Sequence, residues 1–291
     1  MGVHSGRWAV VNGASSVSAW QVNDTTDMKE AVASNTKAGK KRLPGPKSWT
    51  GSYEQFGGIP ASSMMPGSMI SFSGYEAPDN DTVGGTGVTL SGQAMIERLS
   101  VTWNWGTGDV LKMASEFLGH LGLSYADGQA AIFDSAVPNF PSTKQLPTPT
   151  VQVNNAGGYV NWPNLTTLTL TISNEVQSYV NSSTGGLTGR LAGIFDAEVS
   201  ATEQEVLRSL FDLDNIIEFK LPVDATFTNF WIIRFGKVKE FTNIRMDRET
   251  GAIISRNVTI PWTAYDDENP EVVGQIRLPG QVTDWWPIAG S

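Results

Sequence analysis

The chain lacks the residues on which most catalytic and membrane functions depend. It has no cysteine, so it can form neither a disulfide framework nor a thiolate metal site. It has only two histidines, His4 and His120, and no Gly-x-Ser-x-Gly sequence, which leaves nucleophilic catalysis without its usual residues. No apolar run approaches the roughly 18 residues of a membrane-spanning helix, and the first residues lack the pattern of a signal peptide. We therefore expect a protein that is not an enzyme and has no membrane anchor.

Metal and cofactor sites are not indicated either. The acidic runs at 79–82 and 266–269 resemble fragments of calcium loops, but they lack the full ligand spacing and the closing glutamate. The glycine runs at 84–87 and 183–189 are followed neither by a Lys-Ser/Thr pair nor by a helix start, so a phosphate site is disfavoured. The acidic residues select no catalytic pair. We expect no catalytic residues, no metal and no cofactor, and we interpret His120 as structural.

The charge of the chain restricts its partners. A formal charge of −9 opposes tight DNA binding, because an acidic surface repels the phosphate backbone. Such a surface still suits a passage along which DNA slides, since it offers phosphate few Lys or Arg contacts. One basic concentration is present, at Lys37, Lys40, Lys41, Arg42 and Lys47. It is either a solvated loop or a contact patch for an acidic surface on a neighbouring subunit.

Patterning and composition indicate a mainly β protein. Glycine is abundant, and many short runs alternate Val, Thr, Ile, Trp or Phe with polar residues. Within 93–105 one face carries Leu99, Val101, Trp103 and Trp105, and the other carries Arg98, Ser100, Thr102 and Asn104. The polar face is a candidate inner or outer wall. The returning segment at 109–123 fits a strand or a helix, and we favour a strand because its counterpart at 252–260 is clearly β.

The tryptophans admit two explanations. In a monomeric β-sandwich they could form a platform on which sugars stack. Strand-like runs hold Trp8, Trp20, Trp49, Trp103 and Trp105. In such runs, burial in a core or an interface is the ordinary outcome. The tandem Trp285 and Trp286 are expected to dock on the protein's own body or on a neighbouring subunit.

Weak internal similarity divides the chain into two halves, which indicates duplication. The segment 47–55 (KSWTGSYEQ) resembles 189–198 (GRLAGIFDAE), and we expect each to be a strand, with Trp49 and Tyr53, or Leu191 and Phe195, on one face. Further short matches follow in the same order at nearly constant spacing. A Pro-rich stretch between the halves is typical of an extended linker. We expect a first domain at 1–133, a linker at 134–150, a second domain at 151–269 and a C-terminal extension at 270–291.

One segment predicts a helix, at 200–215. Ser200 and Glu203 have the spacing of a capping box. The apolar stripe consists of Val206, Leu207, Leu210 and Phe211. The counterpart at 58–67 carries prolines and cannot form a regular helix of that length. We also expect a β-bulge near Phe241, where the alternation slips.

A family resemblance rests on residues 33–76. The stretch ASNT…G…SWTGSYEQFGGIP…PGSMISFSGYE resembles bacteriophage tail tube proteins, also called major tail proteins, in the version with two tandem tail-tube domains. The second half resembles this family more loosely, through VNSST…GRLAGIFDAEV and the segment 200–215.

The resemblance implies two similar β-sandwich or barrel-like domains with a flanking helix. Family members form stacked rings whose inner strands join into one β-barrel around a lumen that passes the genome. Two domains per chain imply trimeric, pseudo-hexameric rings. The implied partners are further copies, other tail proteins and double-stranded DNA that passes without specific binding. The implied location is the virion tail, after assembly in the host cytoplasm. A tube-capping or baseplate ring protein and a carbohydrate-binding β-sandwich module are the alternatives.

Overall fold

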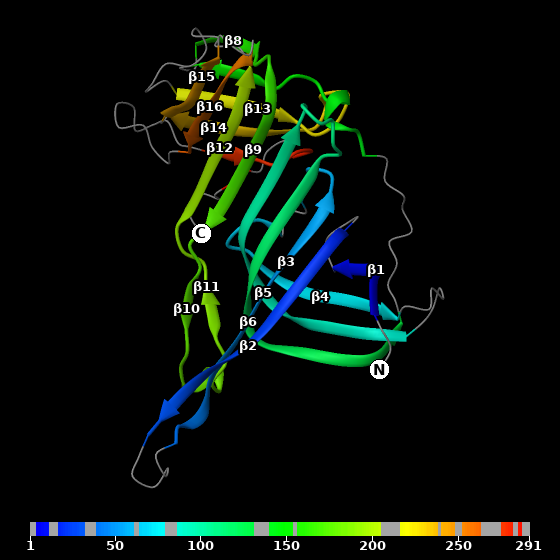
Figure 1. Ribbon diagram of the computed structural model, residues 1–291, viewed down its shortest axis with the longest axis vertical. Coiled ribbons are helices and arrows are strands. Elements are labelled where there is room, and N and C mark those ends of the chain that lie inside the picture. Colours follow the sequence, from blue (N-terminus) through cyan, green and yellow to red (C-terminus); the bar gives the residue numbers. More distant parts are fainter. Residues whose placement is uncertain are drawn as a thin grey trace.

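The computed structural model describes residues 4–11, 17–32, 39–60, 64–78, 86–130, 140–153, 156–204, 216–237, 240–247, 252–262, 275–281 and 285–286. These residues form strands almost throughout (Figure 1), which confirms the predicted mainly β fold. The helical turns among them are the short 3-10 segments η3 (Thr143–Gln145) and η4 (Ser182–Thr184).

The larger sheet has ten strands and draws on both halves of the chain. Its order is β15–β16–β12–β9–β5–β6–β3–β2, with β4 attached to β5 and β1 attached to β4. The strands are β1 (His4–Val11), β2 (Val17–Ala31), β3 (Lys41–Phe56), β4 (Met69–Pro78), β5 (Thr86–Asn104), β6 (Lys112–Ala130), β9 (Leu165–Asn174), β12 (Phe195–Gln204), β15 (Glu240–Asp247) and β16 (Ala252–Pro261). Antiparallel pairing of β5 with β9 joins the part before 134–150 to the part after it.

A six-stranded sheet packs against part of the larger one. Its order is β18–β17–β14–β13–β7–β8. The strands are β7 (Thr150–Val153), β8 (Ala156–Asn161), β13 (Ile216–Pro222), β14 (Phe230–Lys237), β17 (Ile276–Arg277) and β18 (Trp285–Trp286). The backbone of the tandem Trp285 and Trp286 pairs with β17 and so belongs to the protein's own sheet. A separate hairpin is formed by β10 (Gln177–Tyr179) and β11 (Gly189–Leu191).

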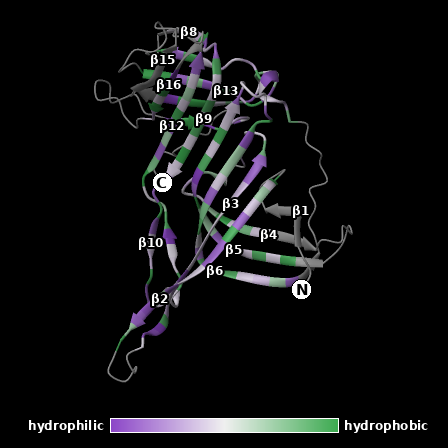
Figure 2. Ribbon diagram, in the orientation of Figure 1, coloured by the Kyte–Doolittle hydropathy of each residue, from purple (hydrophilic) through white to green (hydrophobic). Residues whose placement is uncertain are grey.

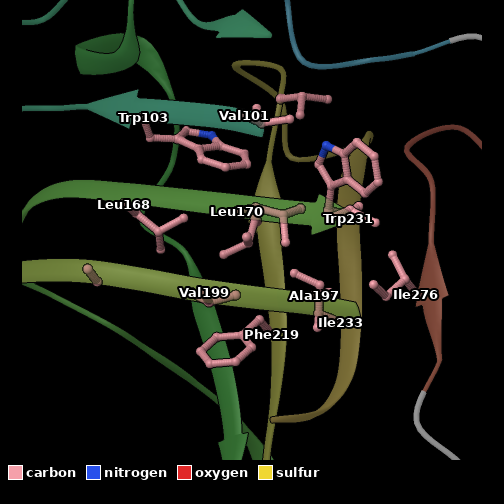
Figure 3. Close-up of a cluster of buried hydrophobic side chains, with 14 of the residues drawn as sticks. Val101, Trp103, Leu168, Leu170, Ala197, Val199, Phe219, Trp231, Ile233 and Ile276 are labelled. Atoms are coloured by element: carbon pink, nitrogen blue, oxygen red, sulfur yellow. The ribbon is translucent and has the colours of Figure 1, made fainter. Parts of the chain in front are cut away.

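The main core lies between the two sheets (Figure 3). Alternate residues of β9, Leu168, Leu170 and Ile172, are fully buried there, as the pleat requires. The six-stranded sheet supplies Phe219 and Trp231 from the opposite side. Hydropathy alternates along the strands of both sheets (Figure 2), so each sheet turns one apolar face inward.

The predicted pairing of 93–105 with the returning segment at 109–123 is confirmed, and the returning segment belongs to strand β6 rather than to a helix. Leu99, Val101 and Trp103 of β5 are completely buried, and Trp105 is partly buried against the same core. The Trp103 Nε1–H donates to the Pro222 carbonyl at 2.7 Å, which joins the two sheets by a buried hydrogen bond.

A smaller aromatic core lies under the first half of the sheet. Trp49 and Tyr53 of β3, each 1% exposed, meet Phe72 of β4 and Phe117 of β6. The Phe72 and Phe117 ring centroids are 5.0 Å apart, and those of Trp49 and Phe117 are 5.9 Å apart. These contacts confirm that Trp49 and Tyr53 share the buried face of their strand.

Two expectations for the second half are wrong. Residues 200–204 belong to strand β12, paired on both sides with β9 and β16, so no helix begins at Ser200. The rest of that predicted helix, 205–215, lies outside the described residues. The segment 189–198 is not one strand but is divided between β11 and β12, and Leu191 is 57% exposed. Tertiary pairing overrides the local pattern in both places.

The predicted irregularity near Phe241 is present. The register between β15 and β16 shifts between Thr242 and Arg245, immediately after Phe241. An extra residue on one strand of an antiparallel pair produces such a shift and bends the strand.

Packing around Trp49 gives a stability test. At Gly119 of β6 an added Cβ would lie 2.2 Å from Trp49 ring atoms, whereas at Gly122 the nearest atom is Leu187 Cδ1 at 3.5 Å. We expect Gly119→Ala to lower the free energy of unfolding by about 1–3 kcal/mol, because the buried ring must shift. Gly122→Ala is the matched control and should have little effect. Urea denaturation followed by tryptophan fluorescence measures both, and equal effects would contradict the packing of Trp49 on β6.

Candidate functional site

The face of the larger sheet turned away from the main core is lined by short polar side chains. We call this surface the polar wall. It consists of Arg98, Ser100, Thr102, Asn104, Thr167, Thr169, Thr171, Ser173, Ser200, Thr202, Asn257 and Thr259. All of these are half-buried or exposed, and they alternate with core residues along each strand. The predicted polar face of β5 is therefore part of a larger surface.

Strand register aligns the wall residues in rows across the sheet. Thr102 of β5 lies opposite Thr169 of β9, which lies opposite Ser200 of β12. Ser200 in turn lies opposite Thr259 of β16. Threonine suits this place because its branched side chain fits a pleated surface while its hydroxyl faces water. The rows form a continuous hydroxyl-rich strip across four strands.

Hydrogen bonds across the strands fix several wall side chains. The hydroxyls of Thr102 and Thr169 are 3.3 Å apart, and the Thr202 hydroxyl donates to Asn257 Oδ1 at 2.9 Å. Arg98 is the single charged residue among these, and Glu198 of β12, which accepts a hydrogen bond from the Ser200 hydroxyl at 3.0 Å, lies on the same face opposite Thr171. The wall therefore offers polar groups to water and little fixed charge to an ionic partner.

A hollow of about 700 Å³ lies at one end of the wall. Its charged lining residues are Glu97, Arg98, Glu116, Glu175 and Asp196. Four carboxylates and one guanidinium make this end acidic. Within the described part of the chain, no group of three or more His, Cys, Asp or Glu side chains is arranged to hold a metal ion.

A buried ion pair lies on the core side of the strands that carry the wall. Glu203 of β12 and Arg256 of β16 are opposite one another in the register and are only 2% and 4% exposed. Arg256 Nε donates to Glu203 Oε1, and the Trp162 Nε1–H donates to Glu203 Oε2 at 2.8 Å. The sequence assigned Glu203 to a helix cap, and the pair becomes visible only once β12 and β16 are aligned.

Both outermost strands of the larger sheet have open edges in the described structure. Strand β2 pairs only with β3, and β15 pairs only with β16. An unpaired edge presents rows of N–H and C=O groups that another strand can complete.

The basic cluster lies on a projecting arm formed by β2 and β3 (Figure 1). The β3–β6 pairing ends at Thr50 opposite Leu118, whereas β2 and β3 stay paired as far as Ala31 opposite Lys41. On this arm Lys40 and Arg42 both face Glu30, with N···O distances of 2.6 and 3.5 Å. Lys37 lies outside the described residues. Both interpretations of the cluster, solvated or contacting a neighbour, fit these exposed pairs.

The arm also exposes apolar side chains, with Met28 57% and Leu43 42% exposed. By contrast, Trp49, Trp103, Trp162 and Trp231 are at most 1% exposed. These four tryptophans are core residues, and they cannot form a stacking platform for sugars.

No protein-family model matches the chain, and no curated protein matches it in sequence. Among the described residues, no helix is long and apolar enough to cross a membrane.

The turn between β13 and β14 is organised by one carboxylate. Asp224 accepts hydrogen bonds from the backbone N–H groups of Thr226, Thr228 and Asn229. It also accepts from the side chains of the same three residues. Burial by itself raises the pKa of Asp224, but the hydrogen bonds from Thr228 and Asn229 outweigh it and hold the pKa at about 2. The sequence Asp-x-Thr-x-Thr-Asn could have indicated such a turn.

Asp224 gives a prediction for acid stability. A pKa lowered in the folded state means that the stabilisation is present above the unfolded value of about 3.9 and is lost as pH falls toward 2. We expect Asp224→Asn to lower the melting temperature at neutral pH, because an amide cannot accept as many hydrogen bonds. The difference from wild type should shrink as pH falls from about 4 to about 2. A pH series of thermal melts measures this, and a constant difference would contradict it.

Glu203 gives a second prediction. Glu203→Ala leaves Arg256 buried without its carboxylate, so we expect the free energy of unfolding to fall by about 3–5 kcal/mol. The matched control is the double variant Glu203→Leu with Arg256→Met, which removes both charges. It should recover most of the loss, because a buried pair stabilises little beyond its own desolvation cost. Urea unfolding measures the free energy of unfolding of both variants. A double variant as unstable as the single one would refute the argument.

Proposed function

We propose that the chain is a structural protein that self-assembles into rings, and that stacked rings form the tube of a bacteriophage tail. The tube is a conduit for DNA during ejection. The protein has no catalytic role in this proposal. Its working parts are the polar wall, which lines the passage, and the open sheet edges, which join neighbouring copies.

The observation that carries the proposal is a polar wall across four inner strands of a sheet whose outermost strands, β2 and β15, have open edges in the described structure. A sheet with a thick core on one side and a hydroxyl-rich strip on the other is suited to line a water-filled channel. Joining β2 of one copy to β15 of the next would continue the sheet around a ring and remove the exposed edges. Main-chain hydrogen bonds would supply the affinity.

The electrostatics favour passage over binding. Affinity for DNA grows with the number of Lys and Arg contacts to phosphate, each of which also displaces counterions. Arg98 is the only Lys or Arg of the wall, and Glu198 on the same face, the acidic hollow at its end and the net charge of −9 add repulsion. DNA would therefore move along such a surface without being held.

The resemblance extends the proposal to stoichiometry and location. Two tail-tube domains per chain, at 1–133 and 151–269, would give trimeric rings with pseudo-sixfold symmetry. The rings would contact other tail proteins and belong to the virion, after assembly in the host cytoplasm. A tube-capping or baseplate ring protein would use the same surfaces without long tubes. A monomeric carbohydrate-binding module is less favoured because the four tryptophans at most 1% exposed lie in the cores.

Electron microscopy of the purified chain in negative stain tests the proposal. We expect rings or tubes with a central hole at high protein concentration, because open edges associate by mass action. Rings without tubes would favour the capping or baseplate role. A persistent monomer would refute self-assembly, and a change of tryptophan fluorescence on adding polysaccharide would favour the sugar-binding module.

Proline variants in β2 test whether ring assembly depends on pairing at the open edge of this strand. Asn23 and Asp24 are consecutive and exposed, so their N–H groups point to opposite sides of the strand. Proline at the position facing β3 should destabilise the fold, which thermal melts report. Proline at the position facing outward should leave the melting temperature nearly unchanged and abolish rings. Rings that persist in both variants would exclude this edge as the joint.

A further inference from the structure

The hairpin of β10 and β11 is attached where β6 separates from β3. Beyond Leu118 the two strands no longer pair, and Leu121 adopts a left-handed backbone conformation with φ of 62°. This conformation is uncommon for a residue other than glycine and is strained. It directs the Leu121 N–H to the Thr188 carbonyl of the hairpin, at 2.8 Å. The hairpin thus occupies the gap between β3 and β6.

Polar contacts hold the hairpin in this gap. The Lys47 N–H donates to the Gly186 carbonyl, and the Thr188 N–H donates to the Lys47 carbonyl, both at 3.0 Å. The apolar side chains of Val180 and Leu191 contribute little, since they are 47% and 57% exposed. An element held by few apolar contacts opens locally at a low free-energy cost. Loss of one or two hydrogen bonds therefore matters here.

Arg190 and His120 form the centre of this joint. Arg190 is 8% exposed, and its Nε donates to the Gly119 carbonyl at 3.1 Å. Its Nη1 donates to the Ser178 hydroxyl of β10. The backbone N–H of Arg190 donates to Nδ1 of His120 at 3.0 Å. The imidazole can accept this bond only while Nδ1 carries no proton.

The surroundings of His120 do not offset a second positive charge. Charged groups at the joint include Arg190 on β11 and Glu97 on β5, which interacts with the Arg190 guanidinium, and the backbone of Lys47 on β3 bridges to Leu187. The neighbouring positions of β4 and β5 are uncharged, namely Ser71, Ser73, Ser91 and Gln93. Protonation would turn Nδ1 into a donor facing the Arg190 N–H and add a cation beside a buried guanidinium.

We propose that His120 is a proton-sensitive latch that holds the β10–β11 hairpin against the body of the protein. With neutral imidazole the hairpin is docked. With protonated imidazole the bond to Arg190 is lost and the hairpin detaches. Imidazoles change charge between about pH 5 and 8, whereas carboxylates do so nearer pH 4. In Figure 1 the hairpin and the β2–β3 arm project from the same end of the molecule, so the latch decides whether the hairpin braces the arm.

Hydrogen–deuterium exchange with mass spectrometry tests the latch on the whole chain. Protection factors, corrected for the intrinsic rate at each pH, are compared for peptides covering 177–191 at about pH 8 and about pH 5. We expect wild-type protection of this hairpin to fall about tenfold at the lower pH, as for the loss of one hydrogen bond and a new repulsion. Peptides covering β9 serve as the internal reference and should not change.

Two variants identify the group responsible. His120→Asn places an amide oxygen near the position of Nδ1 and does not titrate, so the hairpin should stay protected at both pH values. His120→Ala removes the acceptor, so protection should be low at both. Equal wild-type protection at the two pH values would overturn the proposal. So would an acid-induced loss in His120→Asn as large as in wild type. The test does not depend on ring assembly, because it reads a contact within one chain.

Discussion

The alternation of side chains along paired antiparallel strands is the constraint on which the rest of this structure depends. The central strands β5, β9 and β12 of the ten-stranded sheet send every second residue into a core of Leu, Ile, Val, Ala and Trp, and the intervening residues must then face the other side. Burial of the apolar set fixes the register, since a slip of one residue would exchange the two faces. The polar wall follows directly from this register. Thr102, Thr169 and Ser200 lie in one row because the strands are aligned, and no attraction between the three side chains is needed.

Several polar groups inside the molecule form hydrogen bonds that also connect its layers. Trp103 and Trp231 each donate an indole N–H to a backbone carbonyl, of Pro222 and Gly58 respectively, in a distant segment. Between the sheets, Glu203 accepts hydrogen bonds from both Arg256 and Trp162. Such bonds add little net stability but make alternative packings costly, because each alternative would leave a buried donor or charge unpaired.

Where the apolar core ends, the fold leaves edges and projecting hairpins. The β2–β3 arm extends past the last β6 partner and is held mainly by its own ladder and by exposed ion pairs, which stabilise weakly. The β10–β11 hairpin is held by backbone hydrogen bonds and the Arg190 contacts. These are the parts that neighbouring copies or a proton can influence, since little apolar burial opposes their movement. The proposed tube and the proposed latch both follow from this division between a well-packed body and polar projections.

The sequence by itself determined the mainly β fold, the hairpin of β5 and β6, the buried face of Trp49 and Tyr53, and the irregularity after Phe241, because each depends on local alternation. It misassigned Ser200 to Glu203, whose capping-box spacing is also compatible with a strand. Only the tertiary structure decided that β12 lies between β9 and β16, which makes Glu203 a partner of Arg256. It alone also brought Arg190 to His120, 70 residues apart in the chain. Strand pairing is non-local. A local pattern therefore shows which face of the sheet a residue occupies, but not which residue lies opposite it on the paired strand.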